Sequence, residues 1–114
     1  MRGKIAILID DICSTGGTLA TAAKVCKTEG AKAVYAAVSH GLFVGGRLPE
    51  GIDGFMTTDS VPQLKEWKDK VKTVTVASYV AEAIQCVISA KSISSIYTDV
   101  IGEENEAIVL FKNS

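Results

Sequence analysis

The feature that most constrains this fold is an apolar strand that runs directly into a glycine-rich turn and then into a helix. Residues 4–10 read Lys-Ile-Ala-Ile-Leu-Ile-Asp, a continuous apolar run typical of a central parallel strand covered on both faces. Residues 17–29 carry small and apolar side chains at helical spacing and end before Gly30, which suits a helix C-terminus. The order strand, tight turn, helix predicts a βα unit.

Strand and helix patterns continue to alternate further along the chain. Strands are expected at residues 33–39, 52–58 and 73–76. Residues 61–69 are expected to form a connection with a short helical turn, and residues 77–90 a helix with one apolar face. This alternation predicts an α/β fold with an open, mostly parallel sheet flanked by helices.

The end of the chain has a less regular pattern. Residues 93–100 have strand character, residues 102–106 are acidic and turn-like, and residues 107–111 are apolar. A late apolar strand needs a partner, which could be the sheet edge or another subunit, unless the segment is simply an unusual chain end. We expect one domain over residues 1–101, followed by an acidic turn and apolar tail over residues 102–114.

Composition limits the classes of function. The chain has 114 residues, 47% of them hydrophobic, with 12 basic and 13 acidic side chains, which suits one compact domain with its own core. A net charge near zero argues against nucleic acid or an anionic membrane surface as a partner. No apolar run reaches the roughly 20 residues of a membrane helix, and the first residues lack a signal-peptide pattern. We expect a cytoplasmic protein.

The three cysteines are expected to be free thiols. Cys13, Cys26 and Cys86 are odd in number and lack the spacing of a metal site or a disulfide framework. Cys26 and Cys86 lie among aliphatic residues, where a small buried thiol is the ordinary reading. Cys13 lies within the turn after the first strand, and a reactive nucleophile is the alternative there.

That turn, residues 10–18, reads Asp-Asp-Ile-Cys-Ser-Thr-Gly-Gly-Thr and predicts a phosphate site. Ligands of open parallel sheets bind beyond the carboxyl ends of the strands. Three hydroxyl side chains can donate hydrogen bonds, two glycines let the backbone approach a ligand, and the start of the helix presents N–H groups without helical partners. The residues expected to hold a phosphate monoester are Ser14, Thr15, Gly16, Gly17 and Thr18.

Asp10 and Asp11 need a different role, because carboxylates repel phosphate. Two adjacent acids at a strand end can accept hydrogen bonds from vicinal hydroxyl groups or hold Mg²⁺ through water. A phosphorylated sugar presents both needs, so ribose 5-phosphate fits the whole turn. The alternative is a purely structural turn, in which a hydroxyl caps the helix and the two acids mark a solvated strand end.

The turn resembles the phosphoribosyl pyrophosphate (PRPP) signature of type I phosphoribosyltransferases and ribose-phosphate diphosphokinases. Residues 39–43, Ser-His-Gly-Leu-Phe, and residues 92–96, Ser-Ile-Ser-Ser-Ile, are similar to later diphosphokinase segments. The resemblance implies that Asp10 and Asp11 contact the ribose hydroxyls and Mg²⁺, and that residues 14–18 hold the 5-phosphate. Many family members carry an aspartate in place of this chain's serine at the start of that loop, which argues modestly against a transferase.

The resemblance implies a phosphoribosyltransferase-like fold that corresponds to the carboxyl-terminal part of a diphosphokinase and is incomplete. The family transfers diphosphate from Mg-ATP to ribose 5-phosphate, giving PRPP and AMP. Its ATP-binding residues and catalytic histidine lie upstream and have no match here, so we expect ribose 5-phosphate or PRPP as ligand and no activity of this chain alone. A truncated sheet favours a homo-oligomer. The alternatives are a non-catalytic regulatory or associated subunit, and a phosphoribosyltransferase.

Overall fold

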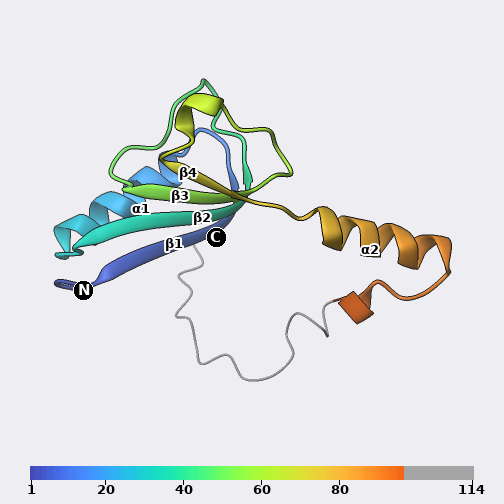
Figure 1. Cartoon of the computed structure of the whole chain (residues 1–114). Helices are drawn as coiled ribbons and strands as arrows, with labels where there is room; N and C mark the ends of the chain where they lie inside the picture. The colour runs from blue at the N-terminus through green and yellow to red at the C-terminus, as the bar shows by residue number, and fades with distance from the viewer. Residues whose placement is uncertain (97–114) are drawn as a thin grey trace. The chain divides into compact units, whose positions relative to one another are not determined.

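The computed structural model describes residues 1–96, which divide into two units, residues 1–74 and residues 75–96. The first unit contains a four-stranded sheet in the order β1-β2-β3-β4 (Figure 1). All three neighbouring strand pairs are parallel. The strands are β1 (Ile5–Cys13), β2 (Ala33–Gly41), β3 (Gly54–Thr58) and β4 (Val71–Val74). The predicted α/β class with a parallel sheet is confirmed.

Helix α1 (Gly17–Thr28) connects β1 to β2, and the short 3-10 helix η1 (Lys65–Trp67) lies between β3 and β4. The second unit contains helix α2 (Ala77–Ile88) and a short helical stretch at residues 94–96. None of the helices within residues 1–96 is both long enough and apolar enough to cross a membrane.

The core of the first unit lies between α1 and one face of the sheet. Its buried hydrophobic residues are Leu8, Cys13, Leu19, Ala23, Cys26, Val34, Ala36, Val38, Phe43, Ile52, Phe55 and Val71. The Phe43 ring packs edge-on against Phe55 and against Trp67, with ring centroids 5.4 Å apart in each pair. These aromatic contacts tie the segment after β2 to β3 and η1, because edge-to-face pairs add to the energy of apolar burial.

The expectation of a central first strand covered on both faces is wrong for the described residues. β1 lies at one edge of the sheet. Leu8 is buried beneath α1, whereas Ile7 and Ile9 on the other face are 52% and 36% exposed. Side chains alternate between the two faces of a strand, and within residues 1–74 helix α1 covers one of them.

Several element boundaries differ from the expected ones. β1 continues beyond Asp10 to Cys13, where a turn was expected, and β4 begins at Val71, two residues earlier than expected. Residues 93–96 form a turn and a helical stretch instead of the start of a strand. The remainder of that expected strand, and the boundary expected after residue 101, lie outside the described residues.

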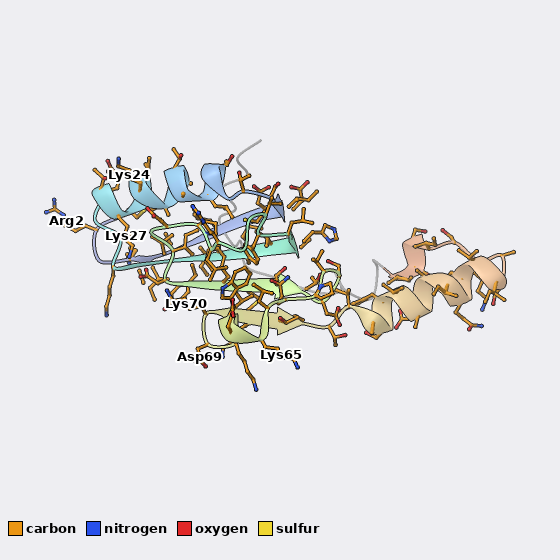
Figure 2. The ribbon with its side chains drawn as sticks, turned by 90° about the horizontal axis from the view of Figure 1, so that it is seen from above. Arg2, Lys24, Lys27, Lys65, Asp69 and Lys70 are labelled. Atoms are coloured by element: carbon orange, nitrogen blue, oxygen red, sulfur yellow. The ribbon has the colours of Figure 1, made fainter. Side chains whose placement is uncertain are left out.

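The amino-terminal end of the sheet is braced by an ion pair. The Lys27 side chain, in the last turn of α1 (Figure 2), donates a hydrogen bond to Asp53 Oδ2 at 2.7 Å. The same carboxylate oxygen accepts the Val34 N–H at 2.8 Å. The hydrogen bond from Lys27, then that from Val34, lowers the pKa of Asp53. Asp53 therefore joins the helix, β2 and the segment that leads into β3.

Candidate phosphate site

The candidate site lies where β1 ends and α1 begins. A cavity of about 130 Å³ is present there, and its lining residues are Asp10, Ile12, Cys13, Ser14, Thr15, Gly16, Gly17, Thr18 and Leu19. The structure thus brings together six of the seven residues singled out from the sequence. Asp11 is not part of the lining, although it lies next to Asp10 in β1.

The hydroxyl groups of the turn are not used by the fold. Within residues 1–96, the side chains of Ser14, Thr15 and Thr18 make no hydrogen bond to protein. By contrast, the Thr21 and Thr28 hydroxyls, further along α1, donate to backbone carbonyl oxygens one helical turn earlier, each at 2.9 Å. The start of α1 also lacks a side-chain cap. The purely structural reading, in which a hydroxyl caps the helix, is therefore not supported.

The two glycines of the turn have different environments. Gly16 is buried and has a φ of 83°, in the left-handed region that favours glycine. A Cβ added to Gly16 would overlap Pro49 Cγ and lie 2.9 Å from Pro49 Cβ, whereas a Cβ added to Gly17 would meet only Thr15 Oγ1, at 4.0 Å. Pro49 occupies the space at Gly16 that the sequence reading gave to a ligand, and the space in front of Gly17 is open.

Both acids are oriented by the backbone that follows them. Asp10 Oδ1 accepts the Asp11 N–H at 2.9 Å, and Asp11 Oδ1 accepts the Ile12 N–H at 2.8 Å. Within residues 1–96, no group of three or more His, Cys, Asp or Glu side chains could hold a metal ion. Mg²⁺ commonly uses one or two carboxylates together with water and substrate oxygens. Asp10, which lines the cavity, fits this mode of Mg²⁺ binding.

Cys13 is a buried thiol. Its side chain is 2% exposed, and burial, followed by the negative charge of Asp10, raises its pKa. A raised pKa keeps the thiol protonated near neutral pH, so a nucleophilic role is not supported. Cys26 is also buried, Cys86 is only partly buried, and all three cysteines are free.

The segment that follows β2 contacts the turn and helps to hold its conformation. The sequence analysis did not predict this contact. The N–H groups of Leu42 and Phe43 donate to Cys13 O at 3.0 and 3.2 Å, and the Val44 N–H donates to Ser14 O at 2.9 Å. Pro49, in the same segment, packs against Gly16. Residues 40–51 are rich in glycine, and no local pattern in them indicates a contact with a turn so far away in sequence.

His40 takes no part in the cavity lining. Its Nδ1 lies 2.7 Å from Ser60 Oγ, and the Thr58 and Ser60 hydroxyls both donate to Ser39 O. These side chains link the carboxyl-terminal ends of β2 and β3. His40 is an exposed residue of β2, and its contact with Ser60 does not assign it a role as a general base.

Comparisons with known proteins place this chain among ribose-phosphate pyrophosphokinase relatives. The ribose-phosphate pyrophosphokinase of Pasteurella multocida (strain Pm70) is 37% identical over 104 residues, covering 86% of this chain and 33% of that protein. The enzyme of the same name from Caldanaerobacter subterraneus subsp. tengcongensis is 40% identical over 103 residues, covering 86% and 33%. This chain therefore spans about a third of the length of these curated relatives.

A solved structure of a related enzyme has a similar fold. The phosphoribosylpyrophosphate synthetase from Mycobacterium smegmatis superposes with a TM-score of 0.69 at 31% identity, over 78% of this chain and 32% of that chain. These similarities confirm the resemblance to ribose-phosphate diphosphokinases. Residues 1–98 match the family described as "Phosphoribosyl synthetase-associated domain". A match over most of its length shows that this chain belongs to the phosphoribosyl synthetase-associated domain family.

Proposed function

We propose that this chain forms the ribose 5-phosphate-binding part of a ribose-phosphate pyrophosphokinase. The observation that carries the proposal is the cavity at the β1–α1 turn, lined by Ser14, Thr15 and Thr18, whose hydroxyl groups have no protein partner within the described residues. The open space in front of Gly17 supports it, because that glycine is required neither by a positive φ nor by close packing. A ligand in the cavity would account for both the unpaired hydroxyl groups and the open space at Gly17.

The 5-phosphate would be held by neutral donors. Hydroxyl groups of Ser14, Thr15 and Thr18, together with N–H groups at the start of α1, donate hydrogen bonds to the dianion. Hydrogen bonds to a charged acceptor are stronger than neutral ones, so the site needs no lysine or arginine. The phosphate would lie in front of Gly17, where a side chain would occupy its place.

Asp10 and Asp11 would contact the sugar. Their carboxylates accept hydrogen bonds from the ribose hydroxyls, and hold Mg²⁺ through water beside them. The ion, when bound, supplies positive charge that offsets the charge of the diphosphoryl group being transferred. Of the two acids, Asp10 lines the cavity, so it has the larger expected effect on sugar binding.

The complete reaction would need more than this chain. Its curated relatives are ribose-phosphate pyrophosphokinases about three times as long, and transfer of a diphosphoryl group from ATP requires a second bound substrate in line with the acceptor. We propose that regions of the relatives outside the matched third bind ATP, and that this chain alone binds ribose 5-phosphate or PRPP weakly, in the cytoplasm, without catalysing the reaction.

The test is a titration of the 114-residue chain with ribose 5-phosphate, followed by amide chemical shifts, with ribose and inorganic phosphate as comparison ligands. We expect shifts at residues 14–18 with ribose 5-phosphate, smaller shifts with phosphate, and none with ribose at the same concentration. Shifts confined to other residues, or none, would refute the binding site. Formation of AMP from ATP and ribose 5-phosphate by this chain alone would refute the proposed inactivity.

A second candidate is a non-catalytic subunit associated with a full-length pyrophosphokinase. It is consistent with the words "synthetase-associated" in the family description. This candidate predicts that the chain captures a full-length pyrophosphokinase and changes its rate of AMP formation. The first candidate does not require such a complex.

We also propose a homo-oligomer. β1 lies at the edge of the described sheet, and Ile5 and Ile7 on it are 60% and 52% exposed. An apolar strand at a sheet edge favours pairing with another chain. Light scattering at tens of micromolar would show a dimer or larger assembly, whereas a monodisperse monomer would contradict the proposal.

A further inference from the structure

We infer that Pro49 is a positioning residue for the phosphate site and acts through Gly16. The inference rests on the proposed function and adds a residue that does not line the cavity. Pro49 is buried, and its Cβ and Cδ lie 2.9 and 3.2 Å from the place that a Gly16 Cβ would take, with Cγ closer still. The proline ring therefore fills the volume beside the Gly16 backbone.

Gly16 is the residue on which the geometry of the site depends. It stands immediately before α1, with a φ of 83° and a ψ of 8°, and its carbonyl oxygen accepts the Ala20 N–H at 2.9 Å. This conformation sets the direction in which the first N–H groups of α1 point. Glycine alone has wide backbone freedom at such a position, so a neighbouring group is needed to hold one conformation.

The segment that carries Pro49 is anchored at its other end. The Gly41 N–H donates to Thr57 Oγ1 at 3.0 Å, and Gln63 Nε2 donates to Gly41 O at 2.8 Å. Phe43 is buried between Phe55 and Trp67 in spite of a φ of 42°. A residue held in the left-handed region by its surroundings indicates that packing fixes this segment tightly.

Residues 42–49 contact the core on one side and the turn on the other. Backbone hydrogen bonds from residues 42–44 fix the carbonyl groups of Cys13 and Ser14, at the start of the turn. Pro49 fixes Gly16, at its end. Between these points lies Thr15, whose hydroxyl lines the cavity. Holding the turn in its binding conformation before the ligand arrives reduces the entropy lost on binding, which raises affinity.

The test compares Pro49→Ala with Pro62→Ala in the full chain. Both variants lose the same ring atoms, and Pro62 is exposed and remote in sequence from the turn. We expect the Pro49 variant to unfold cooperatively and to bind ribose 5-phosphate about tenfold more weakly. The Pro62 variant should bind as the wild type does. Equal affinity in all three proteins would overturn the inference.

A second measurement needs no ligand. Hydrogen exchange of the Ala20 amide, which donates to Gly16 O, should be about tenfold faster in Pro49→Ala, with Ala23 and Cys26 in the same helix unchanged. Pro49→Val, which restores branched apolar volume, should recover part of the protection. An unchanged exchange rate of the Ala20 amide in Pro49→Ala would show that Pro49 has no specific positioning role. Loss of cooperative unfolding in both Pro49→Ala and Pro49→Val would show the same. Absence of binding by the wild type would instead refute the proposed function.

Discussion

Two sets of polar groups, at opposite ends of the parallel sheet, differ in whether they are hydrogen-bonded to protein. At the amino-terminal end, Asp53, Lys27 and the Val34 N–H satisfy one another. At the carboxyl-terminal end, the hydroxyls of Ser14 and Thr15 line a cavity and bond to no protein group within the described residues. The first set holds the fold together, and the second is left without protein partners, as the proposed phosphate site requires.

Under the proposed function, stability and ligand binding depend on different polar groups of this α/β unit. Polar groups paired within the protein contribute to the free energy of unfolding, whereas groups left to water contribute mainly when a ligand replaces that water. Substitutions at the amino-terminal end should therefore change stability alone. Substitutions in the turn should change binding, except at Gly16, where fold and site meet.

Gly16→Ala should have the largest effect and should damage both properties. The new methyl group overlaps Pro49, and alanine is strained at a φ of 83°. We expect the free energy of unfolding to fall by about 2–4 kcal/mol, together with loss of ribose 5-phosphate binding. Urea denaturation measures the first effect. A variant as stable as the wild type would show that the contact with Pro49 is loose.

Gly17→Ala should separate the two properties. Apart from its own helix backbone and its neighbours in sequence, the added methyl group meets no protein atom closer than 4.0 Å, and alanine favours helix over glycine by up to about 1 kcal/mol. Stability should hold or rise, while affinity for ribose 5-phosphate should fall by about a hundredfold, because the phosphate is displaced. Calorimetric titration beside urea denaturation measures both effects. Unchanged affinity would place the phosphate elsewhere.

Asp53→Asn should lower stability and leave ribose 5-phosphate binding unchanged, the opposite of Gly17→Ala. The lowered pKa of Asp53 means that its charge stabilises the fold above the unfolded-state pKa of about 3.9, and that this contribution is lost as the pH falls through the lower folded-state pKa. The variant should be less stable than the wild type at neutral pH, and the difference should vanish in acid. Asp69→Asn, at another exposed aspartate, is the control. Weakened ribose 5-phosphate binding in Asp53→Asn would break the separation between the two ends.

The smallest effect is expected at Cys13. Because its thiol is buried and its pKa is raised, a thiol reagent at neutral pH should leave it unmodified in the folded chain. Cys86, which is only partly buried, should react first. Mass spectrometry of a Cys86→Ser variant isolates the other two cysteines. Rapid modification of Cys13 there would show that the cavity opens more widely than the structure indicates.

Much of the site could be predicted from the sequence, because its residues are consecutive. An apolar run, hydroxyl and glycine residues and a helical pattern follow one another, so local rules place them at the carboxyl end of a strand and the start of a helix. The same rules ended the first strand at Asp10, since Asp11 has low strand propensity, yet pairing with β2 continues to Cys13 and Gly41.

The support of the turn could not be predicted, because it depends on contacts between distant segments. Nothing local to Pro49 indicates that its ring lies beside Gly16, and the two glycines of the turn are equivalent when only the sequence is read. The edge position of β1 was missed for a related reason. An apolar run indicates that a strand is buried in some context, but strand order is set by which segments pair.

The packing of Trp67 against Phe43 gives this chain a built-in optical probe. Trp67 is the only tryptophan in the sequence, and its ring touches the residue whose backbone N–H bonds to the Cys13 carbonyl oxygen. Any shift of the turn that moves Phe43 alters the surroundings of the indole. Intrinsic fluorescence can therefore test the proposed binding of ribose 5-phosphate in unlabelled protein.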